Sequence, residues 1–107
     1  MMVPEIPPNE AARLASLRSL GLLDTPAEER FDTITRLAAR MFNVPIAYIS
    51  LVDENRQFLK SRVGLDFCET GRDVSFCGHA ILETAALVVP DTHQDPRFAD
   101  NPQVTGE

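Results

Sequence analysis

A cysteine and a histidine lie two residues apart in the stretch VSFCGHAI, and a second cysteine, Cys68, precedes them. A thiolate activated by a neighbouring imidazole is a common protein nucleophile. The flanking residues predict a short helix over 75–84 that Ser75 could cap. Because residues two apart on a helix do not face each other, the pattern argues against a Cys77–His79 pair. We expect Cys77 to be a small buried side chain. His79 is expected near the helix surface, where Glu83, one turn on, could pair with it.

Gly78 separates these two residues and costs about 1 kcal/mol inside a helix relative to alanine. A close approach of backbone or ligand would explain a glycine there, and so would its position near the helix start. The sequence leaves these explanations open.

Asp91, His93 and Asp95 form a second group with possible chemistry, because alternate carboxylate and imidazole side chains can share a metal. They lie, however, in a proline-bounded loop. We therefore expect a solvated loop in which Asp95 caps the turn that begins at Pro96. No metal site is predicted, and no cofactor is identifiable from the residues.

Two helices are expected to precede the first strand. The tail, residues 1–9, is rich in proline and is predicted to be extended and poorly ordered. A helix over 10–20 follows, with Asn9 as its cap and Gly21 as its end. Its apolar stripe consists of Ala11, Leu14, Leu17 and Leu20.

The second helix, over 25–43, has a strong predicted start. Thr25 and Glu28 fit a capping box, in which each side chain bonds a free backbone N–H of the first turn, and Pro26 fits the first helical position. One apolar stripe is expected to face the core: Phe31, Ile34, Leu37, Ala38, Met41 and Phe42.

The pattern then changes to strands. Residues 46–53 are apolar on both faces, which favours a central strand, and 57–63 alternate as the second strand of a hairpin. Lys60 and Arg62 would share a solvated face of that strand. The remaining expectations are a polar loop over 64–74, an edge strand over 86–91 and a helical turn near 95–100.

Composition limits the partners. The 107 residues suit one domain, with a formal net charge of −6 and no basic stripe, so nucleic acid and anionic membrane surfaces are poor partners. No apolar run approaches the roughly 18 residues of a membrane span, and the first residues lack the features of a secretory signal. Two cysteines in such a chain suggest reduced thiols in the cytoplasm.

Three stretches, met in order, carry a family resemblance: LDTPAEERFDTITRLAARMFNVPIAYISLVDENRQFLKS, GLDFCETGRDVSFCGHAI and LVVPDTHQDPRFADNP. Together they resemble the GAF domains found at the N-terminus of bacterial signalling proteins such as histidine kinases and diguanylate cyclases. The resemblance implies an α+β fold, with an antiparallel sheet flanked by helices on both faces, over residues 10–107. It also implies that the two central strands and the closing helix of the family lie beyond this segment.

The resemblance further implies a ligand pocket between the sheet and the connections over 64–84 and 91–104. The residues expected to contact an unknown small-molecule ligand are Phe67, Phe76, Cys77, His79, Asp91 and Phe98. The function expected is that of a non-catalytic sensory or regulatory module. The alternative to a sensory function is a structural dimerisation domain that binds no ligand.

The family also includes members with three more specific functions: bilin binding, cyclic-nucleotide binding and methionine sulfoxide reduction. Bilin-binding members attach the pigment to a cysteine directly followed by histidine, whereas Gly78 intervenes here. The Asn-Lys…Phe…Asp-Glu signature of cyclic-nucleotide binding is not found. Free methionine sulfoxide reductases have two cysteines at a spacing similar to that of Cys68 and Cys77. Their catalytic cysteine, however, would fall within 87–95, which has no cysteine. Without that thiolate the reduction lacks its nucleophile. A homodimer through the helix over 10–20 is expected, because its apolar stripe needs a cover.

Overall fold

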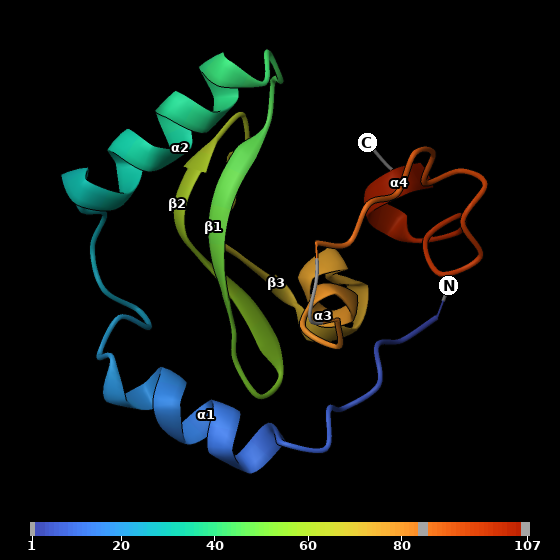
Figure 1. Cartoon of the computed structure of the whole chain (residues 1–107), viewed down its shortest axis with the longest axis horizontal. Coiled ribbons are helices and arrows are strands. Elements are labelled where there is room, and N and C mark those ends of the chain that lie inside the picture. The colour runs from blue at the N-terminus through green and yellow to red at the C-terminus, as the bar shows by residue number, and fades with distance from the viewer. Residues whose placement is uncertain (1, 84–85, 106–107) are drawn as a thin grey trace.

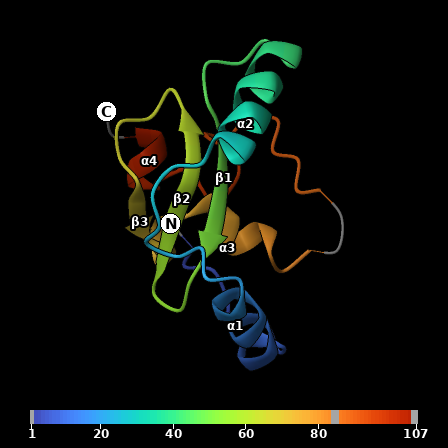
Figure 2. The ribbon, with the colours of Figure 1, turned by 90° about the vertical axis from the view of Figure 1, so that its left-hand side faces the viewer.

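The computed structural model describes residues 2–83 and 86–105. Its sheet has three antiparallel strands in the order β1-β2-β3. The helix α2 lies on one side of this sheet and the short helix α3 on the other (Figure 1). Turned to the α2 side, the molecule shows α2 in front of the strands and α1 below the hairpin (Figure 2). The expected sheet with helices on both faces is thus confirmed. The elements are α1 (Glu10–Ser19), α2 (Glu29–Met41), β1 (Ala47–Val52), β2 (Arg56–Val63), β3 (Glu69–Gly71), the 3-10 helix η1 (Arg72–Val74), α3 (Phe76–Ala80) and α4 (Pro102–Thr105).

The predicted hairpin is confirmed. β1 pairs with β2 from Val52↔Gln57 to Ala47↔Val63, with a bulge between Ile49 and Ser50. β2 is buried along most of its length, on both faces. The expected solvated face is therefore wrong for Lys60, whose side chain is 1% exposed. Because a buried ammonium must be paired, three oxygens of the segment before α2 surround it.

That pairing also decides where α2 begins. The capping box predicted at Thr25 does not form, and α2 starts only at Glu29. Lys60 Nζ instead donates to Thr25 Oγ1 at 2.5 Å and to Pro26 O at 2.6 Å, and it pairs with Glu28 Oε2 at 2.7 Å. A helix over these residues would direct the Pro26 carbonyl to its own backbone. The demand of one buried charge thus overrides a local capping signal.

Thr25→Ala is expected to lower the free energy of unfolding by about 1–3 kcal/mol, because it removes one acceptor from a buried ammonium. Thr25→Ser retains the hydroxyl and should lose much less. Urea denaturation of the two variants measures the difference. Equal stability of the alanine variant and the parent would show that Lys60 does not depend on this oxygen.

The apolar stripe of α2 is only partly buried, contrary to the sequence prediction. Ile34, Leu37, Met41 and Phe42 are each more than half exposed. The side that meets the sheet is centred on Thr35, whose Oγ1 lies 2.6 Å from Ser61 Oγ. Because a polar contact takes the middle of the packed face, much of the stripe is left facing away from the sheet.

The sequence missed the elements between residues 64 and 75. β3 pairs with β2 (Arg56↔Gly71) and runs directly into η1, where a polar loop was expected. Glu-Thr-Gly shows no apolar alternation, so its strand depends on the free edge of β2. The expected strand over 86–91 is also wrong: these residues are all described and form none. Their β-propensity is not matched by a neighbouring strand.

The C-terminal segment turns twice before the described chain ends. Asp95 caps the first turn as predicted, since its Oδ1 accepts from Arg97 N at 2.9 Å. Asn101, 2% exposed, caps α4 through Gln103 N at 2.8 Å. Between the caps, Phe98 points inward and is 1% exposed. The segment thus anchors an aromatic ring in the core.

The N-terminal segment is extended, as expected, but it is packed rather than free. Pro4 and Pro7 are buried. The segment leads into α1, where the Asn9 side chain forms no cap and Leu14 is buried, and Gly21, at φ 65°, follows the helix as predicted. In the part of the chain that the structure describes, no helix is both long and apolar enough to cross a membrane.

Candidate ligand groove

The helix α3 divides the predicted site residues between its two sides. Ser75 caps it, as expected, by accepting from Gly78 N at 2.9 Å. Cys77 faces β1, whereas His79 faces Phe98 and the N-terminal segment. The two side chains therefore do not form a dyad, as the helical spacing predicted.

Three of the predicted residues meet in an aromatic cluster. The Phe76 and Phe98 rings pack edge to face with centroids 4.8 Å apart, and His79 meets Phe98 at 5.1 Å. The expected place of His79 near the surface is wrong: it is 7% exposed, because the N-terminal segment covers it and its Nε2 lies 3.0 Å from Met2 O. Such edge-to-face contacts add to the burial of large apolar rings. The geometry gives this cluster a packing role.

Cys77 lies in a groove between β1, α1 and α3 with a volume of about 380 Å³. Its walls are largely apolar. Ser50 Oγ donates to Cys77 Sγ at 3.0 Å, and Tyr48 OH lies 4.0 Å from the same sulfur. The lining residues are Arg13, Leu17, Ser50, Leu51, Val52, Cys77, Ala80 and Ile81. An apolar cleft with a few converging polar atoms is the usual form of a small-molecule site.

Tyr48 does not itself line the groove, but its hydroxyl reaches Cys77 from β1. Burial raises the pKa of the Tyr48 phenol well above its usual range, and the nearby Cys77 adds to the effect. Tyr48 thus stays protonated and can donate or accept one hydrogen bond. Arg13 contributes the charged edge, with Nη1 donating to Val52 O at 2.5 Å and Nε to Glu10 at 2.9 Å.

Sequence reasoning missed Tyr48 and Ser50. Both belong to β1, and they lie 29 and 27 residues before Cys77 in the chain. Their spacing of two places them on one face of the strand. That polar pair in an otherwise apolar strand is the signal that could have found them, but only the tertiary fold shows that α3 covers the same face.

Two predicted site residues lie elsewhere. Phe67 is 38% exposed in the loop before β3, and Asp91 is exposed and accepts from His93 N at 3.0 Å. Asp95 pairs with Arg97 rather than with His93. Among the described residues, no three His, Cys, Asp or Glu side chains gather as metal ligands would. The roles of Phe67 and Asp91 toward a ligand remain predictions.

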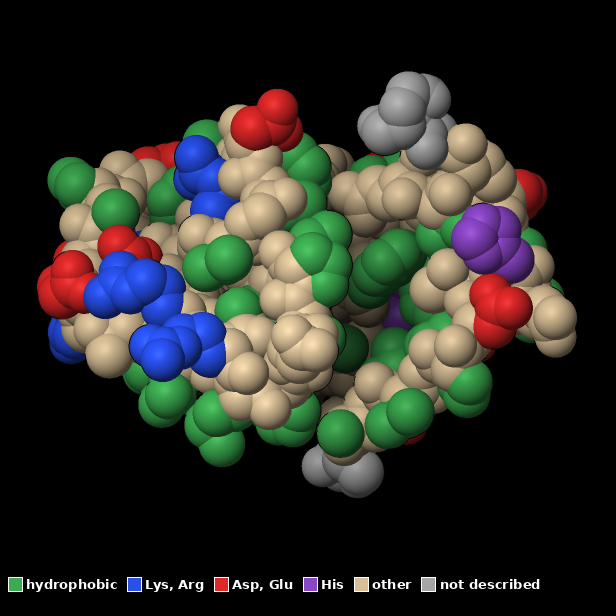
Figure 3. All heavy atoms as spheres, turned by 90° about the horizontal axis from the view of Figure 1, so that it is seen from above, with side chains coloured by type: hydrophobic (Ala, Val, Ile, Leu, Met, Phe, Trp, Pro, Cys, Tyr) green, Lys and Arg blue, Asp and Glu red, His purple; other side chains and the backbone are tan. Residues whose placement is uncertain are grey.

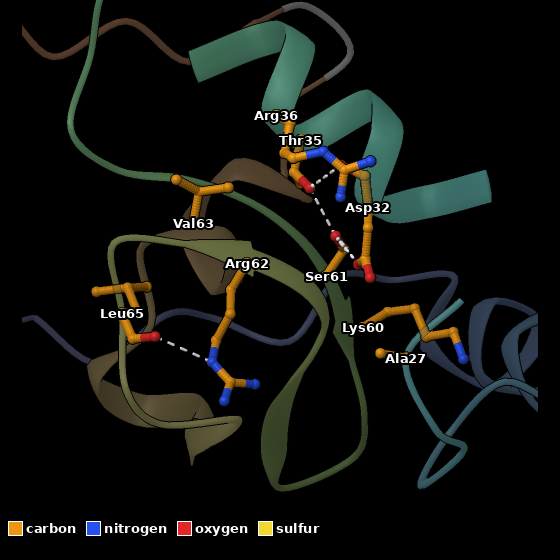
Figure 4. A pocket seen from close by; sticks show the side chains of 9 residues that line it. All are labelled: Ala27, Asp32, Thr35, Arg36, Lys60, Ser61, Arg62, Val63 and Leu65. Carbon is orange, nitrogen blue, oxygen red and sulfur yellow. Dashed lines mark hydrogen bonds between the residues drawn. The ribbon is translucent and has the colours of Figure 1, made fainter. Parts of the chain in front are cut away.

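A second cavity, of about 450 Å³, lies between α2 and β2 (Figure 4). Three of its polar side chains bond to one another, and Lys60 and Arg36 bond to residues outside the cavity lining. Ser61 Oγ donates to Asp32 Oδ1 at 2.6 Å and also meets Thr35 Oγ1. Arg62 Nε donates to Leu65 O at 3.0 Å, on the same rim. This bonded chain fixes α2 to the sheet, and it leaves the Cys77 groove as the better candidate for a ligand.

Seen from above, the molecule is hollowed between the part that holds α2 and the sheet and the part that holds α4 (Figure 3). Hydrophobic side chains cover the walls of this hollow. Apolar surface open to solvent is therefore not confined to α2.

The two cysteines are free thiols in different surroundings: Cys68 is exposed, and Cys77 is half-buried. We expect Cys68 to react with a thiol reagent faster than Cys77, because access limits the rate. Peptide mass spectrometry after timed N-ethylmaleimide labelling separates the two sites, with Cys68→Ser as the control. Faster labelling of Cys77 in the native protein would contradict the placement of its sulfur against Ser50.

The sequence profile of the GAF domain matches residues 26–107. The chain belongs to the GAF domain family. A cyclic di-GMP phosphodiesterase of Pseudomonas aeruginosa is 44% identical to this GAF domain over 107 residues, which are all of the chain and 18% of that relative. The chain therefore spans about a fifth of the length of the curated relative it matches. The resemblance noted in the sequence is confirmed.

Proposed function

We propose that this GAF domain is a non-catalytic sensory module that binds a small molecule in the groove beside Cys77. The supporting observation is the groove itself. Apolar side chains line most of it, and the polar atoms of Ser50 and Cys77 meet within it, with the Tyr48 hydroxyl 4.0 Å from the sulfur. That arrangement can orient a ligand by hydrogen bonds while burying its apolar part.

We further propose that the domain regulates the turnover of cyclic di-GMP by an output domain. The relative from Pseudomonas aeruginosa is named as a cyclic di-GMP phosphodiesterase, and this chain matches 18% of it at 44% identity. A match of that size over one module supports a shared regulatory role.

The side chains around Cys77 support binding rather than catalysis. A nucleophilic thiol needs a base or a nearby cation to form its thiolate. Cys77 instead meets the hydroxyls of Ser50 and Tyr48, while His79 bonds on the other side of α3. We therefore assign Cys77 to the lining of the groove.

A chimeric enzyme tests this function. This chain replaces the matching segment of the Pseudomonas aeruginosa phosphodiesterase, and hydrolysis of cyclic di-GMP is measured. Ala80→Phe fills the groove and should change the rate at least about fivefold, the lower end of typical allosteric coupling. Ala86→Phe, at an exposed position that does not line the groove, is the matched control. Equal rates for both variants and the parent chimera would refute regulation through the groove.

We also propose a homodimer through α1, with the contact at the C-terminal end of the helix. Leu14 is buried in its own chain, whereas Leu20, just after α1, is 61% exposed. Leu20→Glu should therefore convert a dimer to a monomer without unfolding it. Analytical ultracentrifugation measures the mass, with Ala15→Glu on another side of α1 as the control. A parent chain that is monomeric at high micromolar concentration would exclude this dimer.

A further inference from the structure

The N-terminal residues 2–8, here called the strap, lie across α3 and the turn at Arg97. Figure 1 shows the strap running from beside α3 and α4 toward α1. Its inward positions recur every third residue: Pro4 and Pro7 are buried, and Val3, Glu5, Ile6 and Pro8 are exposed. A period of three is that of the extended polyproline conformation, which proline favours without internal hydrogen bonds. The strap therefore packs against the domain through one side, which carries Pro4 and Pro7.

The seat on α3 requires a glycine. A Cβ at Gly78 would lie 2.8 Å from Pro4 Cγ and 2.9 Å from Ser75 Oγ, closer than real Cβ atoms come to a neighbour. The close approach that could explain Gly78 in the sequence is thus the approach of the strap. Beside it, His79 Nε2 meets Met2 O at 3.0 Å, and Met2 N donates to Arg97 O at 3.4 Å.

A partly buried ion pair holds the other end of the strap. Glu10, the first residue of α1, accepts from both Nη atoms of Arg72, at 2.5 Å and 3.1 Å. Arg72 belongs to η1, which lies directly before the Ser75 cap of α3. The strap is therefore fixed beyond Pro7, and it meets α3 through Met2 and Pro4.

The helix α3 has only five residues, and it contacts the strap on one side and lines the groove on the other. Gly78 and His79 hold the strap, and the residue before them, Cys77, lines the groove. Five residues make less than one and a half helical turns, so Cys77, Gly78 and His79 share a single turn. We therefore expect a displacement on the strap side to reach Cys77.

We infer that the strap and the groove are coupled through α3, so that docking of the strap sets the position of Cys77 and the shape of the groove. The coupling is reciprocal: whatever occupies the groove and moves α3 changes the affinity of the strap for its seat by the same factor. The inference rests on the proposed function only for the assignment of the groove as the ligand site. The strap thus gives the module a route by which groove occupancy reaches the N-terminal end of the domain.

Adjacent prolines provide a matched test in the Cys68→Ser background. The double variant Pro4→Ala, Pro7→Ala removes both buried rings, and Pro8→Ala removes an exposed one. We measure the labelling rate of Cys77 by N-ethylmaleimide and the exchange of the Met2 amide, which donates to Arg97 O when the strap is docked. In the double variant, both rates should rise at least about fivefold, the lower end of typical coupling. Pro8→Ala should leave both unchanged, and the exchange of β2 amides reports that each variant is folded.

The reverse direction supplies the second arm. In the parent with Cys68→Ser, alkylation of Cys77 should speed the exchange of the Met2 amide by a similar factor. The inference is overturned if the double variant exchanges the Met2 amide at the parental rate, or if the strap is released while Cys77 labels as before. It is also overturned if alkylation leaves the strap unchanged. None of these readouts uses the chimeric enzyme, so they stand or fall separately from the proposed regulation of cyclic di-GMP turnover.

Discussion

Phe98→Ala is expected to lower the free energy of unfolding by about 3–5 kcal/mol, the range for removing a fully buried aromatic ring. Phe98 is 1% exposed and packs edge to face with both Phe76 and His79. Removing it leaves a cavity and ends both ring contacts. Because domains of this size are stable by only about 5–15 kcal/mol, the variant should unfold at a much lower urea concentration.

The matched control is Phe67→Ala, since that ring is 38% exposed and is not among the residues of the aromatic cluster. Its loss should cost less than about 1 kcal/mol, as for most surface substitutions. Both variants are compared with the parent by urea denaturation. Similar midpoints for the two phenylalanine variants would mean that Phe98 is not a core residue.

Arg72→Ala has the second large expected effect, a loss of about 3–5 kcal/mol, because it removes the buried partner of an ion pair that is otherwise partly exposed. The Arg72 side chain is 6% exposed. Besides Glu10, it donates to Asp53 O at 3.2 Å and to Glu54 O at 3.1 Å, so it fixes the β1–β2 turn to α1. All of these acceptors lose a donor at once. Arg13 still pairs with Glu10, which favours the lower end of the range.

Arg18→Ala is the matched control for Arg72. Arg18 pairs with Glu54, and the two side chains are 55% and 63% exposed, so its loss should cost at most about 1 kcal/mol. Thermal unfolding of the two variants in one buffer makes the comparison. If Arg72→Ala were no more costly than Arg18→Ala, the Arg72–Glu10 ion pair would contribute no more than an exposed one.

The same ion pair predicts a pH dependence. Hydrogen bonds from Arg72, and then from Arg13, lower the pKa of Glu10 from 4.5 to about 2. The Glu10 carboxylate therefore binds a proton less readily in the folded protein than in the unfolded chain. The stabilisation is complete above about pH 5 and is lost as the pH falls toward 2. Glu10→Gln should be less stable than the parent at pH 7, and the difference should shrink across that window.

Much of the local structure could be predicted from the sequence. The β1–β2 hairpin follows from apolar runs separated by turn residues, and the Ser75 cap and the Asp95 turn follow from short side chains that bond their neighbouring backbone. The family resemblance follows from three motifs in order. The separation of Cys77 from His79 follows from helix geometry alone. Each of these features depends on residues close together in the chain.

The missed features depend on residues far apart. The start of α2 was set by Lys60, whose buried ammonium draws on Thr25 and Pro26 across more than thirty residues. The polar contacts of Cys77 come from Tyr48 and Ser50, and the need for Gly78 comes in part from Pro4. Local patterns state which conformation a segment prefers. Only the tertiary structure decides which buried polar groups must be paired and which surfaces meet, and those long-range demands override the weaker local preferences.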